Sequence, residues 1–542
     1  MKKITHTAIL FLLAFGPMTL FAQLTEQWSY TYDGKGNGEE ELFALELDDY
    51  GNTFLLAVTD TGFLDNAATV IKLDTAGNLV WQSFVQLNGN SPDPTGMVLD
   101  TDSNVYISGY YNSPGNFSSD VFLVKFSPEG DQLWASYFQS PGNTLDDCNG
   151  MAVDNSGNLV LFGQTGTSAA GYDFLVLKYD TAGTKIWDGT FDHPNNKSDD
   201  ANAMAIDADN SIYICGKNIN TGVSGSDFLT VKFDSMGVAL WHKTYDDSLM
   251  RDDACNSIVI DNNGDIIVTG ESFDWGPGYP VYKVATIKYD SSGNEKWVTR
   301  FRASNSTTIP SKIVADNNNS LYVSASAYYD LTAFDALLIK YDASGNEVFT
   351  RRVNGNNNSF DDGNDVMVGA NGLIYMAGSV ENTNTYADGF VQVYNTIGDS
   401  LMQKQWNSSQ SDDDYFQMLR MDHMGAVIVA GQIEKLNDLD LVVVKYSGPA
   451  SLSVSKEKLN HSLAIFPNPS QGTFTVKLPA SGHDLITITL TDLTGKIVFT
   501  KTKTINVSQT ELTIKTNDLS SGIYSVSVQS KGENFTGKHV IR

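Results

Sequence analysis

A segment of about 53 residues recurs eight times between Trp28 and Tyr446, and this long period limits the possible folds more than any other feature. Its clearest mark is Lys-aromatic-Asp-x-x-Gly-x-x-x-Trp, as in the run from Lys178 to Trp187. The glycine of this mark recurs at Gly77, Gly130, Gly183, Gly237, Gly293, Gly345 and Gly398. Because each unit of a repeat protein buries its apolar face only against its neighbours, the period predicts a ring or stack of similar units.

Each unit contains four short runs with strand character and no helical periodicity. In the third unit they are residues 151–153, 159–162, 174–178 and 185–187. Four strands at a period near 50 residues are typical of β-propeller blades. The sequence therefore predicts an all-β chain with an eight-bladed propeller, and a seven-bladed ring with one decayed unit is the alternative.

The connections between the runs predict the strand order within a blade. The first and second runs, and the third and fourth, are joined by short turns such as Asp154 to Asn158, whereas the other two links are longer and vary. The run that carries the Trp is therefore the outer strand. Since the chain begins with such a run, Trp28 to Tyr32, and its last unit lacks one, the N-terminal strand should complete the last blade and close the ring.

The longer loops should share one face of the propeller, and that face is regularly acidic. Eight residues before the first-turn Asp, or its equivalent, stand Glu40, Pro92, Asp146, Asp199, Asp253, Thr308, Asp361 and Asp414. We expect these residues around the mouth of the central channel, where six carboxylates suit a calcium site. The alternative is that each carboxylate caps loop N–H groups in its own blade and keeps the protein soluble. No cofactor is required in either case.

The longer loops also carry aromatic residues that do not repeat. The ligand-binding candidates are Tyr110, Tyr111, Trp275, Tyr328 and Tyr329. Exposed rings beside Asp and Asn suit sugar stacking or protein anchoring, and the alternative is packing onto blade edges.

Two other residue types are interpreted as structural. The repeated Lys72, Lys125, Lys178, Lys232, Lys288, Lys340 and Lys445 lie inside apolar strands and need partners, which the repeated Asp residues can supply. Only three cysteines occur, too few for a disulfide framework. Cys215 is predicted to be a small buried hydrophobe, and a Cys148–Cys255 bridge is an open alternative.

Composition and motifs favour a binding protein over an enzyme. The formal net charge of −29 argues against nucleic acid or an anionic membrane as partner. The chain has no His-x-x-x-His pair, nucleophile elbow or phosphate loop. The function expected is non-catalytic binding of an extracellular protein or glycan, and the alternative is a surface polysaccharide- or peptide-degrading enzyme.

The two ends of the chain predict export. Lys2, Lys3 and the apolar run that follows look like a secretory signal over residues 1–22, with cleavage between Ala22 and Gln23. No later segment has the roughly 18 apolar residues of a membrane span. The other predicted parts are the propeller (23–447), a Ser/Lys-rich linker (448–462) and a small C-terminal β-sandwich of immunoglobulin-like type (463–542).

Both predicted domains resemble known families. The turns and period resemble the SBBP repeats of secreted bacterial β-propellers, which implies the scaffold but no activity. The C-terminal segment resembles the type A sorting domain of the Bacteroidetes type IX secretion system. The matching residues are Pro467, Asn468, Pro469, Gly472, Gly495, Lys496, Gly522, Tyr524 and Lys538. This resemblance implies the type IX machinery as a partner, and release or attachment at the cell surface via the periplasm.

Overall fold

The structure is a computed structural model. It describes residues 23–34, 38–60, 66–87, 92–112, 118–142, 144–167, 171–194, 197–219, 225–247, 251–275, 278–303, 306–408, 412–435, 438–447, 464–477, 485–491, 497–504, 511–516, 519–520, 522–530 and 533–541. Every regular element in these ranges is a strand, which confirms the predicted all-β class. The chain divides into two compact units, Met1–Ala450 and Ser451–Arg542. The predicted signal at residues 1–22 lies outside the described residues.

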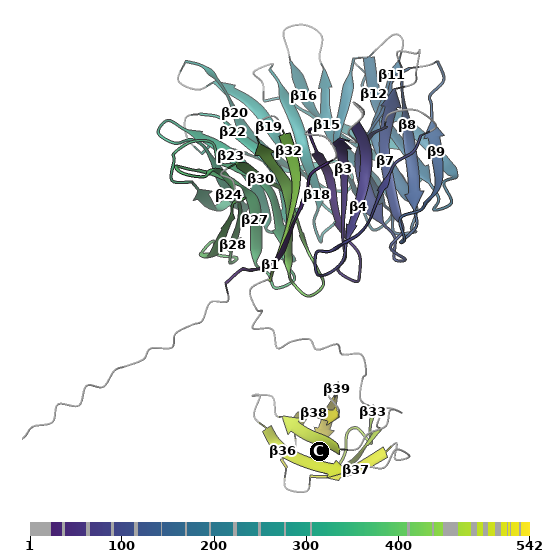
Figure 1. Ribbon diagram of the computed structural model, residues 1–542, viewed down its shortest axis with the longest axis vertical. Helices are drawn as coiled ribbons and strands as arrows, with labels where there is room; N and C mark the ends of the chain where they lie inside the picture. Colours follow the sequence, from purple (N-terminus) through teal and green to yellow (C-terminus); the bar gives the residue numbers. More distant parts are fainter. Residues whose placement is uncertain are drawn as a thin grey trace, which may run out of the picture. The chain divides into compact units, whose positions relative to one another are not determined.

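The first unit consists of eight antiparallel sheets of four strands, which are the blades of the propeller (Figure 1). Blades 1 to 4 contain β2 (Glu41–Leu47), β3 (Thr53–Asp60), β4 (Asn66–Leu73), β5 (Leu79–Phe84); β6 (Pro92–Leu99), β7 (Val105–Asn112), β8 (Ser119–Phe126), β9 (Gln132–Phe138); β10 (Asp146–Val153), β11 (Leu159–Thr167), β12 (Gly171–Tyr179), β13 (Lys185–Phe191); β14 (Asp199–Ile206), β15 (Ile212–Ile219), β16 (Ser226–Phe233) and β17 (Ala239–Tyr245). Blades 5 to 8 contain β18 (Asp253–Ile260), β19 (Ile266–Trp275), β20 (Pro280–Tyr289), β21 (Glu295–Phe301); β22 (Thr308–Ala315), β23 (Leu321–Tyr329), β24 (Ala333–Tyr341), β25 (Glu347–Val353); β26 (Asp362–Val368), β27 (Ile374–Asn382), β28 (Tyr386–Tyr394), β29 (Ser400–Trp406); β30 (Asp413–Met421), β31 (Val427–Lys435), β32 (Asp438–Ser447) and β1 (Thr25–Tyr32).

The first strands of the blades form the inner ring. Each contacts the first strand of the next blade, and β2 contacts β30, so the series of contacts is closed. Apolar clusters lie between successive blades and are built mainly from the buried apolar residues of the second and third strands. The outer strands are the most exposed, as in β5 and β13. These contacts establish eight blades.

The N-terminal strand closes the ring, as predicted. β1 pairs antiparallel with β32, with Trp28 opposite Lys445 and Tyr32 opposite Leu441. The two strands lie side by side although they come from opposite ends of the unit (Figure 1). The last blade is therefore completed by the first residues of the propeller, and its third strand has no free edge.

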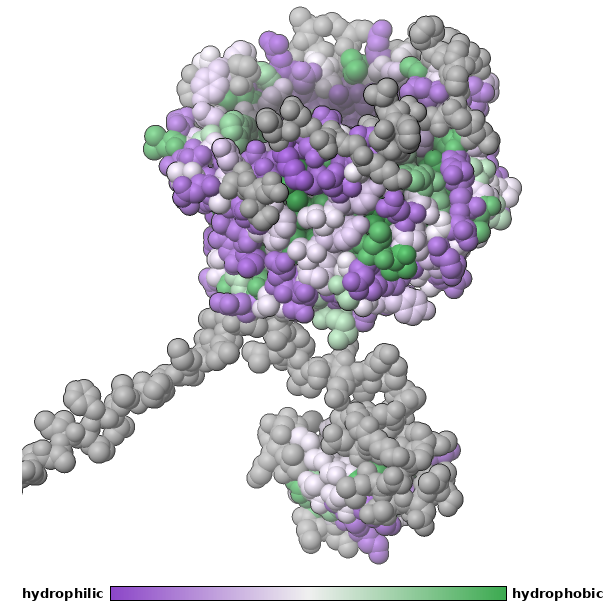
Figure 2. All heavy atoms as spheres, in the orientation of Figure 1, coloured by the Kyte–Doolittle hydropathy of each residue, from purple (hydrophilic) through white to green (hydrophobic). Residues whose placement is uncertain are grey.

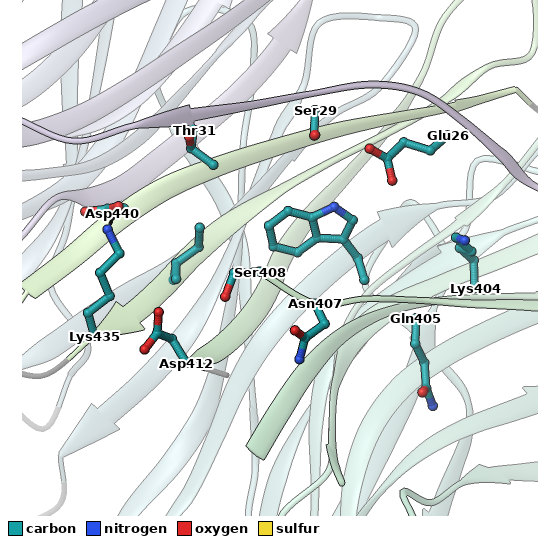
Figure 3. A pocket seen from close by; sticks show the side chains of 12 residues that line it. Glu26, Ser29, Thr31, Lys404, Gln405, Asn407, Ser408, Asp412, Lys435 and Asp440 are labelled. Atoms are coloured by element: carbon teal, nitrogen blue, oxygen red, sulfur yellow. Dashed lines mark hydrogen bonds and ion pairs between the residues drawn. The ribbon is translucent and has the colours of Figure 1, made fainter. Parts of the chain in front are cut away.

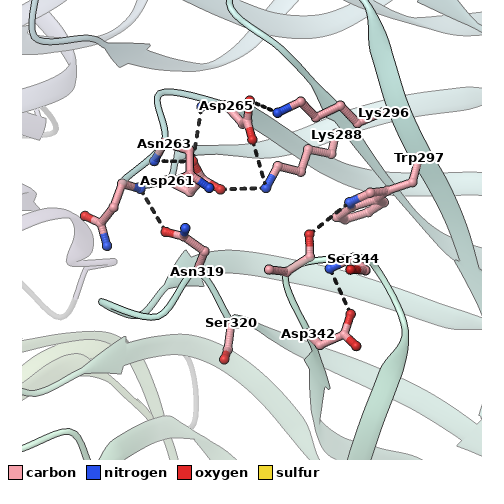
Figure 4. A network of polar contacts seen from close by, with 12 residues as sticks. Asp261, Asn263, Asp265, Lys288, Lys296, Trp297, Asn319, Ser320, Asp342 and Ser344 are labelled. Carbon is pink, nitrogen blue, oxygen red and sulfur yellow. Dashed lines mark hydrogen bonds and ion pairs between the residues drawn. The ribbon is translucent and has the colours of Figure 1, made fainter.

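The short turns of the repeat share one geometry. In blade 3, Oδ1 of Asp154 accepts the N–H groups of Ser156 (2.8 Å) and Asn158 (2.9 Å). The fourth residue, Gly157, has a φ of +81°, which favours glycine. Three other first turns place Ser103, Asn210 and Asn319 in the same left-handed region. Figure 4 shows the corresponding polar network in blades 5 and 6.

The aromatic ring at the Trp position of an outer strand packs on the next blade, at the glycine of the turn between the third and fourth strands of that blade. We call this contact the interblade clasp. A Cβ at Gly183 would lie 2.9 Å from Cε3 of Trp134, so no other side chain fits beneath the ring. Several indoles also donate a hydrogen bond to a carbonyl of the same turn, as Nε1 of Trp81 does to Pro128 (2.9 Å). The clasp pairs are Trp28 with Gly77, Trp81 with Gly130, Trp134 with Gly183, Trp187 with Gly237, Trp241 with Gly293, Trp297 with Gly345 and Phe349 with Gly398.

The clasp explains where the repeat loses its aromatic ring. The outer strand of blade 7 carries Met402 at this position. Its neighbour, blade 8, has no turn between the third and fourth strands, because its fourth strand is β1 from the other end of the unit. An indole at residue 402 would therefore have no glycine turn to cover.

The repeated lysines use two kinds of partner, depending on the second strand. Where an aliphatic residue lies opposite, the lysine pairs with the first-turn Asp, as Lys178 does with Asp154 (2.6 Å). Where a tyrosine lies opposite, its hydroxyl occupies that Asp, as Tyr213 does on Asp207 (3.0 Å). Lys232 then lies over the Tyr213 ring and donates to a carbonyl of the next blade. The predicted Asp partners are thus confirmed for Lys178, Lys288 and Lys445. Lys125 combines both arrangements, because it lies over the ring of Tyr106 and also 3.7 Å from Asp100.

The cysteine prediction was wrong. Cys215 forms a disulfide with Cys255, while Cys148 is a buried free thiol. The first strand of one blade packs on the second strand of the previous blade, so β18 lies on β15. This packing brings the Cα atoms of Cys215 and Cys255 to 5.8 Å from each other. Cys148 has the same register position as Cys255 but in blade 3, two blades away, so these two cannot meet.

The C-terminal unit has two sheets around one core. One sheet holds β33 (Ala464–Phe466), β34 (Thr473–Lys477) and β37 (Glu511–Lys515), and the other β36 (Ile497–Thr504), β35 (Leu485–Thr491), β38 (Gly522–Ser530) and β39 (Glu533–Ile541). Residues of both sheets share one apolar cluster, which includes Phe474 and Ile488. This is the predicted small β-sandwich.

Among the described residues, no helix is long and apolar enough to cross a bilayer. The propeller face in Figure 2 is mostly hydrophilic, and its hydrophobic residues form small separate patches.

The cysteine arrangement predicts a thiol count. The folded mature chain should show no thiol reactive with Ellman's reagent, because Cys148 is buried. Unfolding without reductant should release one thiol, and reduction should release all three. The Cys148→Ser variant, as a control, should release none without reductant. Three thiols from the unreduced chain, or a bridge that contains Cys148, would contradict the assignment.

Candidate functional site

The five aromatic candidates have different environments. Tyr111 is only 8% exposed and packs edge-on against Tyr137, so it belongs to the blade interior. Tyr329 lies under the Arg352 guanidinium, which is 4.3 Å from the ring centroid. Tyr110 is half-buried, and burial raises the pKa of its hydroxyl, helped by Asp93 and Asp147 nearby. Trp275 and Tyr328 remain on the loop face.

Tyr328 lines a hollow of about 410 Å³ between the long loops of blades 5 and 6. Three rings form its walls: Tyr279 from blade 5, and Tyr328 and Phe334 from blade 6. Ser306, Thr307 and Asp330 supply polar groups. Tyr328 and Phe334 meet edge to face with centroids 5.5 Å apart, and Phe360 stacks on Phe334 at 6.0 Å. Phe360 is 61% exposed, so the aromatic surface continues beyond the hollow.

The sequence singled out only part of this hollow. Phe334, near the start of β24, and Phe360, Ser306 and Thr307, in loops, were missed, because none of them belongs to an aromatic pair in the sequence. A signal existed for Phe334: it directly precedes the repeated third-strand Asp, as Tyr172 does in blade 3.

A second hollow, of about 570 Å³, lies at the seam between blades 7 and 8 (Figure 3). It is lined by Glu26, Ser29, Thr31, Lys404, Gln405, Trp406, Asn407, Ser408, Asp412, Ile433, Lys435 and Asp440. Several of its polar groups are bound within the protein: Lys435 pairs with Asp440, and Ser408 N–H donates to Asp414. Lys404, Gln405 and Trp406 of this lining come from β29, the outer strand in which Met402 replaces the clasp Trp.

The first-strand carboxylates are buried and cap backbone groups. Glu40, Asp146, Asp199, Asp253, Asp361 and Asp414 are all 0% exposed. In blade 4, Oδ2 of Asp199 accepts the N–H of His193 (2.8 Å), six residues earlier in the loop from blade 3. Asp146, Asp253, Asp361 and Asp414 accept the N–H of the residue six positions earlier in the same way. These side chains therefore hold the loops between blades. This is the capping role expected from the sequence as the alternative to calcium binding.

Each of these carboxylates belongs to a set of three positions between neighbouring blades. The set combines a residue near the start of one blade's third strand, the residue that follows the paired part of its outer strand, and the capping residue of the next blade. We call it the junction triad. From the junction of blades 1 and 2 around the ring, the triads are Ala67, Gln86, Pro92; Asp120, Gln139, Asp146; Asp173, Asp192, Asp199; Asp227, Asp246, Asp253; Lys283, Arg302, Thr308; Asp335, Asn354, Asp361; Asp388, Asn407, Asp414; and Asp440, Asp33, Glu40.

Three triads are fully acidic, and in each the carboxylate oxygens lie within 4.8 Å of one another. They are the triads at the junctions of blades 3 and 4, 4 and 5, and 8 and 1, the last joined by Asp438. Burial, with Asp173 and Asp192 nearby, raises the pKa of Asp199 to about 7. Burial, with Asp438, Asp440 and Asp33 nearby, likewise raises the pKa of Glu40 to about 7.

The C-terminal motif residues tie the ends of the sandwich together. Oδ1 of Asn468, between Pro467 and Pro469, accepts the N–H of Val540 near the chain end (2.9 Å). Gly472, at a φ of +81°, accepts from Thr516, and buried Tyr524 donates its hydroxyl to the Ser520 carbonyl (2.7 Å). Gly522 begins β38, and Lys538 of β39 lies opposite Ser525 of β38 in the register. Gly495 and Lys496 lie outside the described residues.

Comparison with known families identifies this unit. Residues 464–542 match the family described as "Secretion system C-terminal sorting domain". The C-terminal unit is a type IX sorting domain. The protein is therefore exported by the type IX system, and is secreted or held at the outer-membrane surface.

The propeller has remote relatives. An uncharacterized WD repeat-containing protein, L264, of Acanthamoeba polyphaga mimivirus is 23% identical over 511 residues. That match covers 68% of this chain and 35% of the relative, so the chain spans about a third of the relative's length.

Solved structures with similarity include PorZ, a surface component of the type IX secretion system of Porphyromonas gingivalis (13% identity, 93% of this chain, 59% of that chain, TM-score 0.38). An ulvan lyase of polysaccharide lyase family PL25 is also similar (11% identity, 71% of this chain, 96% of that chain, TM-score 0.39). The similar structures include enzymes and non-enzymes and do not assign an activity.

The raised pKa values predict how stability depends on pH. Burial raises the pKa of Asp173 and Asp253 to about 6, and that of Asp361 and Asp414 to about 7. The folded chain then binds more protons than the unfolded chain between about pH 4 and 7, so stability falls as pH rises through this range. In EDTA and constant salt, the melting temperature should be at least about 3 °C lower at pH 8 than at pH 5.5.

Asp414→Asn is the matched variant for this test. The side-chain oxygen of the new asparagine can still accept the Ser408 N–H. Its uncharged NH2 group replaces the carboxylate oxygen that lies near Asp388 and Asp412. The variant should show a smaller pH dependence of melting. A melting temperature that is flat or rises from pH 5.5 to 8 would contradict the account.

Proposed function

We propose that the protein is a non-catalytic binding protein of the cell exterior that holds a glycan in the hollow between blades 5 and 6. The observation that carries the proposal is this hollow of about 410 Å³, walled by Tyr279, Tyr328 and Phe334 and bordered by hydroxyl groups. Aromatic faces stack on the apolar faces of sugar rings, and hydroxyl and carboxylate groups bind their edges. A net charge of −29 favours a neutral or basic glycan over an acidic one.

The junction triad supports this location. Between blades 5 and 6 the triad is Lys283, Arg302 and Thr308, the one triad with basic residues. Lys283 and Arg302 both pair with Asp274, which directly precedes Trp275. The repeat thus changes where the aromatic hollow occurs, and departures from a repeat are where binding is expected.

The hollow favours binding over hydrolysis. Among the residues that line it, Asp330 is the only carboxylate, whereas most glycosidases need two. We therefore rank a polysaccharide- or peptide-degrading enzyme second.

A glycan array with the mature chain tests the proposal. Tyr279→Ala and Tyr328→Ala should each weaken binding of the best glycan at least about tenfold, because each removes a stacking face. Tyr50→Ala is the matched control, since Tyr50 is 71% exposed but lies in a short turn on the opposite side of the blades. Equal binding by all three variants, or no glycan bound, would contradict the proposal. Release of reducing ends from a bound glycan would favour the enzyme.

A further inference from the structure

The triad of Asp173, Asp192 and Asp199, at the junction of blades 3 and 4, differs from the others in its unused oxygens. Its three carboxylates come from three elements: Asp173 from β12, Asp192 from the residue after β13, and Asp199 from the start of β14. One oxygen of each lies within 4.8 Å of the others. Asp199 is 0% exposed and Asp173 7%, and each has a buried Oδ1 without a hydrogen-bond partner.

Neither of the other acidic triads has this combination. Between blades 4 and 5, Asp253 uses both oxygens, one on the Asp247 N–H and one on the Phe273 N–H. Between blades 8 and 1, Lys435 pairs with Asp440 and supplies a positive charge. Among the ion pairs of the described residues, none includes Asp173, Asp192 or Asp199. Three close carboxylates, of which two are buried, repel one another when they are ionised, and either a proton or a bound cation relieves this repulsion.

We propose that Asp173, Asp192 and Asp199 form a calcium-binding site that joins blades 3 and 4. Carboxylate oxygens are the ligands that calcium prefers, and its flexible coordination leaves room for backbone carbonyls and water. Asp192 is exposed, so the ion can enter from solvent. Oδ2 of Asp199 can continue to accept the His193 N–H when calcium is bound, because the ion would use Oδ1, which has no hydrogen-bond partner. This site is independent of the aromatic hollow.

The location fits weak extracellular binding. The sorting domain marks the protein for export by the type IX system. Calcium sites of extracellular modules have dissociation constants on the order of 10⁻⁴–10⁻³ M. Magnesium requires a near-ideal octahedron at short distances and should bind more weakly at three carboxylates from three elements. Bound calcium would hold the end of β13 and the start of β14 together and so stabilise this junction.

The test is isothermal titration of the full mature chain, freed of metal, with CaCl2 and MgCl2 at pH 7.5. Asp192→Asn should weaken calcium binding at least tenfold, with one equivalent lost. The fold should tolerate this variant, because two other triads have an asparagine at the position of Asp192. These are Asn354, between blades 6 and 7, and Asn407, between blades 7 and 8. Asp173→Asn should have the same effect. Asp188→Asn is the control, because Asp188 lies in the same outer strand, half-exposed and paired with Lys185.

Melting provides a second readout. Calcium should raise the melting temperature of the parent chain and of Asp188→Asn more than that of Asp192→Asn. No heat of binding up to about 10 mM calcium, well above the dissociation constants of such sites, would overturn the proposal. Binding that Asp192→Asn and Asp173→Asn leave unchanged would also overturn it, because the ion would then lie elsewhere.

Discussion

The contact between an outer-strand aromatic ring and the glycine of the next blade holds this architecture together. Glycine is required at residue 183 for two reasons. Its φ of +82° favours glycine, and the Trp134 ring covers the position that a Cβ would occupy. Ser136 adds a hydrogen bond to the Gly183 carbonyl (2.6 Å). Because both partners belong to one repeated motif, each unit offers a ring to one neighbour and a glycine to the other, and the period of the sequence becomes the ring of blades.

Closure follows from the same contact. Trp28, on a strand from the N-terminus, covers Gly77 of blade 1 and donates to the Thr75 carbonyl (3.0 Å). β1 thus both completes blade 8 and links it to blade 1. The cost is the seam between blades 7 and 8, where no turn exists for a clasp and a polar hollow remains. Since the turn side is occupied by clasps and Asp caps, the loop side is free to vary, and there the junction triads and aromatic residues differ from blade to blade.

Local, repeated features could be predicted from the sequence, whereas pairings across blades could not. The turn from Asp154 to Asn158 and the outer position of Trp187 follow from residue types and loop lengths, and blade order, closure and the sorting unit were correct. The Cys215–Cys255 disulfide was missed because it depends on which strands of two blades face each other. Tyr111 and Tyr329 looked like surface rings, but alternation along a strand does not show that Tyr137 or Arg352 lies against them.

Urea unfolding of Trp134→Ala tests the central claim most directly. The indole is only partly buried, so surface burial alone predicts a small effect, whereas loss of the clasp should lower the free energy of unfolding by about 2 kcal/mol. Leu133→Ala is the comparison, because Leu133 is the preceding residue of β9 and 53% exposed, and should change the free energy of unfolding by less than about 0.5 kcal/mol. A loss for Trp134→Ala no larger than that for Leu133→Ala would contradict the claim that the clasp holds the blades together.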